Sequence, residues 1–245
     1  MSPPTTRLSR REATAIAQAF LPPRRFGDRT PYYYVRSKLA ADPLYGGIVA
    51  VLRDSRAPLL DLGCGLGLLA HTLRNAGVEL PYRGVDNDAR KIERARRAAQ
   101  RAGLAATQFD TLDLATVLPA HAGSVALLDV LQFLAPVAQE RLLEAAVAML
   151  TPGASLVLRC GLDDGSWRAR VTRRVDEFSR WVRWMNAAPT RYPAREALEQ
   201  RFAAAGLQTT FSPLFGRTPF NNWRIVATRP LEATTAGHDC GACAR

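Results

Sequence analysis

The stretch Leu59-Leu60-Asp61-Leu62-Gly63-Cys64-Gly65-Leu66-Gly67 decides the fold expected for this chain. Its apolar start indicates a buried strand, and the three glycines let the backbone turn tightly and let a ligand approach closely. A helix is predicted over 66–75, so the N–H groups of its first turn would face the same ligand. The stretch therefore predicts a strand, a ligand-binding loop and a helix in succession.

Two details separate this loop from a dinucleotide-binding loop. That loop has the pattern G-x-G-x-x-G, which would place its third glycine at position 68, where this chain has Leu68. The carboxylate of Asp61 at the strand tip would repel a pyrophosphate, whereas it suits a ligand ammonium group. Both details disfavour a dinucleotide as the ligand.

From residue 57 onward, short apolar runs alternate with helical patterns, which predicts βαβ units and a parallel sheet. Strands are expected at 58–62, 82–85, 106–109, 124–128, 154–159, 208–212 and 223–228. Helices are expected at 66–75, 88–101, 136–150 and 193–206, with an additional one at 166–185. The predicted fold class is α/β.

The first 56 residues have a different pattern. Ser9 and Glu12 form a capping box ahead of a helix that Pro22 stops, and two further helices are expected at 33–40 and 43–52. The predicted organisation is a helical cap at 1–56, an α/β domain at 57–230 and a flexible tail at 231–245. The α/β domain would carry a helical insert at about 165–187.

The charge is unevenly distributed along the chain. Its 245 residues include 33 Lys+Arg and 22 Asp+Glu, a formal net charge of +11. Residues 1–56 have a net charge of +6, residues 57–160 of 0 and residues 161–245 of +5. The excess positive charge therefore lies on the flanks, where it suits an acidic partner or nucleic acid.

Three expectations concern the location of the protein and its cysteines. No apolar run approaches the ~20 residues that span a bilayer, and no secretory signal is recognisable, so the expected location is cytoplasmic. Cys64 and Cys160 lie in apolar contexts and are expected to be small buried side chains. Cys240 and Cys243 form a CxxC pair without the second pair that tetrahedral zinc needs, so no metal site is predicted.

The sequence resembles the class I S-adenosylmethionine-dependent methyltransferases, whose first motif is D/E-x-G-x-G-x-G. Asp61 and the three glycines match it position for position, and Asp86 follows 25 residues later at the end of the second strand. The resemblance covers residues 57–229. It implies S-adenosylmethionine as cofactor and a Rossmann-like, doubly wound sheet of seven strands, mostly parallel, with a C-terminal antiparallel hairpin.

The resemblance also implies roles for individual residues. Asp86 would accept hydrogen bonds from the ribose hydroxyls, Asp110 would lie beside the adenine amino group, and Asp129 would face the sulfonium and the acceptor. Asp113 is an alternative to Asp110, which could also be a helix cap. The predicted cofactor-binding residues are Asp61, Gly63, Cys64, Gly65, Gly67, Asp86, Asn87, Asp110, Thr111 and Asp129.

Within this superfamily, the chain is similar to bacterial small-molecule methyltransferases associated with pigment or aryl polyene biosynthesis. The similarity lies in Tyr32-Tyr33-Tyr34-Val35-Arg36-Ser37-Lys38-Leu39 and in Thr218-Pro219-Phe220-Asn221-Asn222. The chain departs from this subset at Gln132, where the subset often has histidine, so no general base is assigned. The candidate substrate or cap residues are Tyr34, Arg36, Lys38, Gln132 and Trp181.

The predicted function is transfer of a methyl group to a small aromatic or polyene-type metabolite, free or tethered to an acidic carrier protein. The alternative is an RNA methyltransferase that uses the Arg-rich flanks. Against RNA, the N-P-P-Y signature of base amino-group methylation is missing after the fourth strand. A cofactor-binding protein without catalysis is a third reading.

Overall fold

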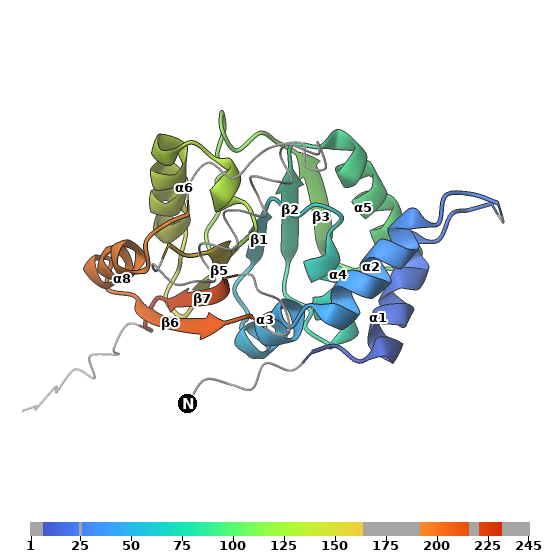
Figure 1. Cartoon of the computed structure of the whole chain (residues 1–245), viewed down its shortest axis with the longest axis horizontal. Helices are drawn as coiled ribbons and strands as arrows, with labels where there is room; N and C mark the ends of the chain where they lie inside the picture. The colour runs from blue at the N-terminus through green and yellow to red at the C-terminus, as the bar shows by residue number, and fades with distance from the viewer. Residues whose placement is uncertain (1–6, 25, 164–191, 216–220, 232–245) are drawn as a thin grey trace, which may run out of the picture.

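The computed structural model describes residues 7–24, 26–163, 192–215 and 221–231. Seven described strands form one sheet in the order β3-β2-β1-β4-β5-β7-β6 (Figure 1). They are β1 (Leu59–Leu62), β2 (Tyr82–Asp86), β3 (Thr107–Thr111), β4 (Ser124–Leu128), β5 (Ser155–Gly161), β6 (Gln208–Pro213) and β7 (Asn222–Thr228). The first five strands are parallel, and β7 runs antiparallel to β5 and β6. The predicted Rossmann-like sheet with a C-terminal antiparallel pair is confirmed.

The described helices lie on both sides of the sheet. They are α1 (Arg10–Ala17), α2 (Thr30–Ala41), α3 (Leu44–Leu52), α4 (Leu68–Asn75), α5 (Ala89–Ala102), α6 (Pro136–Ala148) and α8 (Arg195–Ala204), with short 3-10 helices η1 (Gln18–Phe20) and η2 (Leu131–Phe133). The helix expected at 166–185, Trp181 and the C-terminal CxxC all fall outside the described residues.

Local signals in the sequence set most helix ends. Ser9 and Glu12 make the predicted capping box, and the Asp88 carboxylate caps α5. Helix α4 begins two residues later than predicted, because Gly67 adopts a left-handed φ of +71° and serves as its N-cap. Helix α2 begins earlier than predicted because Asp28 accepts the N–H of Thr30 (2.8 Å).

The two faces of the sheet have separate hydrophobic cores. One core joins helices α1 to α5 to a face that includes Leu59, Ala126 and Val157. The other joins α6 and α8 to the opposite face, including Leu60 and Leu127. The N-terminal helices thus share a core with the sheet, and the division of the chain into a cap and a domain stays a prediction.

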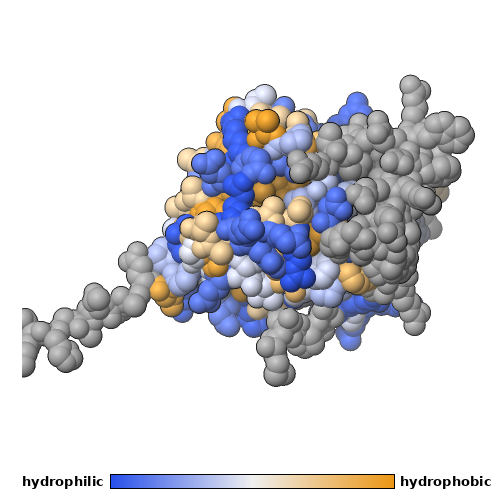
Figure 2. All heavy atoms as spheres, turned by 60° about the vertical axis from the view of Figure 1, so that its left-hand side comes forward, coloured by the Kyte–Doolittle hydropathy of each residue, from blue (hydrophilic) through white to orange (hydrophobic). Residues whose placement is uncertain are grey.

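The surface is mixed in character. In Figure 2, hydrophobic residues are scattered among hydrophilic ones over the described part of one face. None of the described helices combines the length and the apolar character that a membrane crossing would need.

Cys64 and Cys160 are buried free thiols, as expected, and burial raises the pKa of both.

Candidate active site at the strand ends

The glycine loop follows β1 at the edge of the sheet where the parallel strands end. Gly63, Gly65 and Gly67 all have left-handed φ angles, of +81°, +55° and +71°. The N–H groups of Gly63 and Cys64 both donate to the carbonyl of Val85 on β2, at 2.8 and 2.9 Å. The loop is therefore fixed to the neighbouring strand β2. It lies where the order of strands in the sheet reverses, with β2 and β3 on one side of β1 and β4 and β5 on the other.

The three glycines serve different purposes. A Cβ atom at Gly63 would lie 2.3 Å from Val130, and one at Gly67 would lie 2.5 Å from the ring of Phe109. A Cβ atom at Gly65 would meet nothing within 4 Å. Gly63 and Gly67 therefore permit close packing inside the protein, whereas the backbone at Gly65 borders open space.

Asp61, at the end of β1, is buried beneath this loop with one oxygen unpaired. It is 2% exposed, and the Tyr82 hydroxyl donates to its Oδ2 atom (2.5 Å). Its Oδ1 atom is buried, and no described residue forms a hydrogen bond with it. Burial raises the pKa of Asp61 to about 7, although the Tyr82 hydrogen bond opposes the rise. A cationic donor at Oδ1 would favour the ionised form.

Asp86, at the end of β2, ties the glycine loop to the next helix. Its Oδ2 atom accepts the N–H of Gly65 and its Oδ1 atom accepts the N–H of Asp88, both at 2.9 Å. Lys91 lies 4.0 Å from Oδ1, and Asn87 beside it is exposed. Each carboxylate oxygen has a second lone pair, so Asp86 retains the capacity to accept ligand hydroxyls. Its contact with the loop was not foreseen from the sequence.

Asp110 has protein partners that the sequence did not indicate. Strand β3 extends beyond the predicted end at Phe109, so Asp110 lies within the strand. Arg83 donates to its carboxylate (2.8 Å), and Arg96 lies 3.8 Å away. Thr111 is exposed at the strand end, and Asp113 accepts a backbone N–H two residues further on (3.0 Å). The adenine role of Asp110 stays a prediction.

Asp129 follows β4 and joins a group of charges, here called the anchor cluster: Lys38, Asp42, Asp129 and Arg159. The guanidinium of Arg159 on β5 lies 2.6 Å from Asp42 and 3.1 Å from Asp129. Lys38 lies 3.2 Å from Asp42 and 4.0 Å from Asp129. The cluster fastens the turn between α2 and α3 to the ends of β4 and β5.

The anchor cluster contains the residues that sequence reasoning missed. Asp42 and Arg159 were not assigned roles, although an arginine inside the apolar run of β5 signals the need for a partner. Burial opposes ionisation of Asp42, but Arg159 and Lys38 more than offset it and lower the pKa of Asp42. Asp129 adopts a left-handed φ of +61°, which is uncommon outside glycine and occurs at functional turns.

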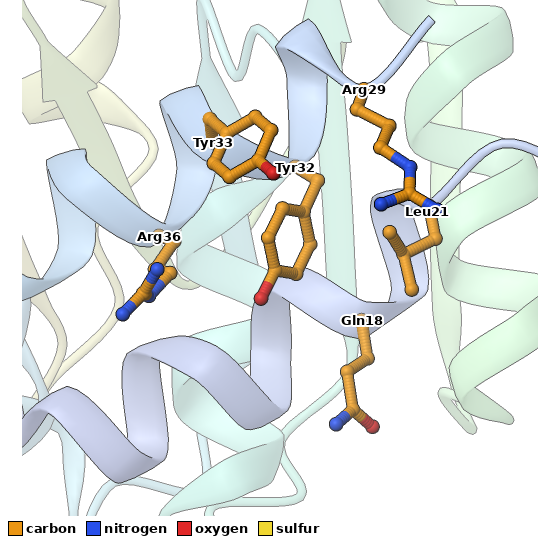
Figure 3. Close-up of a pocket in the computed structure, with 6 residues that line it drawn as sticks. All are labelled: Gln18, Leu21, Arg29, Tyr32, Tyr33 and Arg36. Atoms are coloured by element: carbon orange, nitrogen blue, oxygen red, sulfur yellow. The ribbon is translucent and has the colours of Figure 1, made fainter. Parts of the chain in front are cut away.

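The remaining candidates are dispersed. Tyr34 and Arg36 are exposed on α2, whereas Gln132 is buried in η2 after β4. Of these, Arg36 helps to line a groove of about 590 Å³ on the N-terminal helices (Figure 3). The groove is lined by Gln18, Leu21, Arg29, Tyr32, Tyr33 and Arg36. Two cations and two aromatic rings, without a carboxylate, make this groove suitable for an anionic partner.

Comparisons with known proteins agree with this arrangement. Residues 59–153, which include the glycine loop, Asp86, Asp110 and Asp129, match a family model described as a methyltransferase domain. Over these residues the chain is similar to the methyltransferase domain that the family model describes. No curated protein matched the sequence.

Solved structures share the fold of this chain at low sequence identity. Magnesium protoporphyrin IX methyltransferase (ChlM) from Synechocystis PCC 6803, with bound SAH, is 17% identical with a TM-score of 0.60; the match covers 88% of this chain and 93% of that chain. The pyocyanin biosynthetic protein PhzM is 16% identical with a TM-score of 0.58, over 84% of this chain and 59% of that chain. An O-methyltransferase family protein from Burkholderia thailandensis is 18% identical with a TM-score of 0.57, over 83% of this chain and 61% of that chain.

A buried histidine on α4 gives a prediction about the pH dependence of stability. His71 on α4 packs against Phe20 with ring centroids 5.0 Å apart, and its buried Nε2 atom has no hydrogen-bond partner in the described part of the chain. Burial lowers the pKa of His71 to about 4, so the unfolded chain binds this proton more readily between pH 6.5 and 4. Stability should therefore fall as the pH drops through this window.

His71→Leu should remove that part of the pH dependence. Between pH 7 and 4.5, the wild-type protein should lose about 2 kcal/mol more unfolding free energy than the variant. Urea denaturation of both proteins at the two pH values measures the difference. Equal losses in both would show that His71 is not the titrating group.

Proposed function

We propose that the glycine loop, Asp61 and Asp86 hold S-adenosylmethionine. The observation that carries the proposal is the buried, unpaired Oδ1 atom of Asp61 beneath a loop whose backbone borders open space at Gly65. The carboxylate of Asp61 would receive the ammonium group, and Asp86 would accept hydrogen bonds from the ribose hydroxyls. The adenosine end of the cofactor would be lined by Asn87, Thr111 and Asp110. Asp110 would keep its pairing with Arg83.

The bound cofactor supplies a methyl group activated by attachment to a sulfonium cation. The residues of the chain then have to orient the cofactor and the acceptor, because alignment contributes much of the rate of such a displacement. Asp129 and Gln132 follow β4 and are the proposed neighbours of the acceptor. An acceptor that is readily ionised or already nucleophilic, such as a phenol or an amine, suits a site to which no general base is assigned.

The proposed acceptor is a small aromatic or polyene-type metabolite. Two structurally similar proteins are described as a pyocyanin biosynthetic protein and a magnesium protoporphyrin IX methyltransferase, and both names refer to planar aromatic compounds. Tyr34, exposed on α2 one turn before Lys38, provides an aromatic surface near the end of β4. Trp181, the other aromatic candidate, is outside the described residues.

We further propose that the groove of Figure 3 receives an acidic carrier protein that presents the acceptor. The guanidinium groups of Arg29 and Arg36 would pair with carboxylates, and the rings of Tyr32 and Tyr33, which meet edge to face at 5.1 Å, would pack against the carrier. The groove lies on the segment of the chain with a net charge of +6. RNA would be attracted by the same charges and is the alternative partner.

Labelled methyl transfer tests the acceptor. Purified protein is supplied with methyl-labelled S-adenosylmethionine together with cell extract, and the label is followed in small molecules, acid-precipitable protein and RNA. Label should appear in small molecules or on a carrier protein. Label confined to RNA would overturn the proposed acceptor while leaving the cofactor site intact.

The groove can be tested in the same assay. The double variant Arg29→Glu, Arg36→Glu should lower transfer to a carrier-bound acceptor by at least about 10-fold, because two attractive contacts become repulsive. Arg53→Glu is the matched control, because Arg53 is an exposed arginine of the N-terminal 56 residues that lies outside the groove. Equal transfer by both variants would exclude the groove as the docking surface.

A further inference from the structure

Arg224 on β7 is a fully buried cation beside the anchor cluster. Its side chain is 1% exposed, and its position pairs directly with Arg159 across the antiparallel β5 and β7 strands. Directly opposed residues place their side chains on the same face of a sheet, about 5 Å apart at the backbone. The side chains of Arg159 and Arg224 therefore leave the sheet on the same face, the one that α3 covers.

Most of the hydrogen-bonding capacity of Arg224 is unused. Its Nη2 atom donates weakly to the Ser212 hydroxyl (3.3 Å), while Nε and Nη1 are buried and have no hydrogen-bond partner among the described residues. The Nε atom of Arg159 is also buried without a partner. A Cβ atom at Gly47 of α3 would lie 1.7 Å from Nη1, so glycine at this position makes room for the guanidinium. Within the part of the chain that the structure describes, three donors on these two directly opposed residues are therefore unpaired.

The charges at this place do not balance. The anchor cluster contributes two cations and two carboxylates, and Arg224 adds a third cation for which the described residues supply no carboxylate within 4.0 Å. A buried charge without a partner is strongly unfavourable, and arginine does not escape the cost by losing its proton. One further negative charge would complete both the charge balance and the hydrogen bonds.

The cluster has an exposed end next to the proposed acceptor site. Asp129 at the end of β4 has 38% of its side chain exposed, and Lys38 has 27%. Arg159, adjacent to Asp129, has 11% of its side chain exposed, and Arg224 lies opposite Arg159 on the neighbouring strand β7. The anchor cluster is therefore exposed at Asp129 and Lys38 and neighbours Arg224 through the pairing of β5 with β7.

We propose that Arg224, together with Arg159, binds a carboxylate group of the methyl acceptor. A guanidinium fork matches the planar geometry of a carboxylate, and a single negative charge is what the cluster lacks, which favours a carboxylate over a phosphate dianion. This inference rests on the proposed function, because it concerns the acceptor of the same site. It makes Arg224 a specificity-determining residue.

Benzoate and its neutral analogue benzamide are suitable probes at constant ionic strength. Benzoate should raise the Tm of the wild-type protein with increasing concentration, and benzamide should not. Arg224→Met should abolish the benzoate effect, and Arg224→Lys should weaken benzoate binding at least about 10-fold. Arg229→Met, a change of a partly buried arginine just beyond the opposite end of β7, is the matched control and should bind benzoate normally.

The stability of the unliganded protein gives a second readout. Since Arg224 is an unpaired buried charge, Arg224→Met should raise the Tm by about 2–8 °C without benzoate. A lower Tm for this variant, together with an unchanged benzoate response in Arg224→Lys, would show that Arg224 is a structural group and would overturn the proposal. Calorimetry with S-adenosylmethionine is run in parallel. Normal cofactor binding without a benzoate response rejects only this inference, whereas absent cofactor binding rejects the proposed function.

Discussion

Asp86→Ala is expected to weaken S-adenosylmethionine binding by about 100-fold or more. The substitution removes the carboxylate proposed to hold the ribose hydroxyls. It also removes the acceptor for the N–H of Gly65, so the loop loses its tether to β2 at the position that borders open space. Losing the ligand contacts and the ordered loop together explains the large effect. Isothermal titration calorimetry of the purified variant measures it.

Asp88→Ala is the matched control for this experiment. Asp88 is two residues away and caps α5 by accepting the N–H groups of Arg90 and Lys91. Its loss should cost about 1 kcal/mol of stability but leave the glycine loop in place, so cofactor affinity should stay within about 3-fold of wild type. Asp86→Asn keeps one accepting oxygen and should lie between the two. Wild-type affinity in Asp86→Ala would rule out this carboxylate as part of the cofactor site.

Arg159→Met is expected to lower the free energy of unfolding by about 3 kcal/mol. The shortest ionic contact of Asp42 is with the guanidinium of Arg159, at 2.6 Å, and Asp42 is buried. Removing Arg159 leaves that carboxylate dependent on Lys38 and on the N–H of Leu44, and it also releases Asp129. Urea denaturation at pH 7 measures the loss.

Two further variants separate charge from packing. Lys38→Met should cost only about 1 kcal/mol, because Lys38 is partly exposed and Asp42 keeps Arg159. The double variant Arg159→Met, Asp42→Asn should recover part of the loss, because the stranded buried charge is gone. A loss in the double variant equal to the sum of the two single losses would show that packing, and not the ion pair, determines the effect.

Arg159 and Arg224 make an informative contrast. They lie opposite each other on adjacent strands, and both are buried. Among the described residues, Arg159 has two carboxylate partners, so its removal should destabilise the protein, whereas Arg224 has none, so its removal should stabilise it. Both residues are buried arginines, so the presence or absence of a carboxylate partner determines whether the substitution should lower or raise the stability of the protein.

The sequence alone determined where the described strands and helices follow one another along the chain and the nature of the glycine loop. These features depend on local chemistry: left-handed backbone at Gly63, Gly65 and Gly67, side-chain caps at Ser9 and Asp88, and apolar runs with strand or helix periodicity. Such signals act over a few residues, so they can be recognised in the linear sequence.

Only the tertiary structure decided which polar side chains meet. Arg159 and Asp42 are 117 residues apart in the chain, and Asp110 pairs with Arg83 across two strands. The tether from Asp86 to Gly65 and the opposition of Arg159 and Arg224 depend on strand register, which packing of the whole sheet sets. The sequence shows which residues are charged. Whether a charged side chain is buried, paired or available to a ligand depends on neighbours that folding brings together.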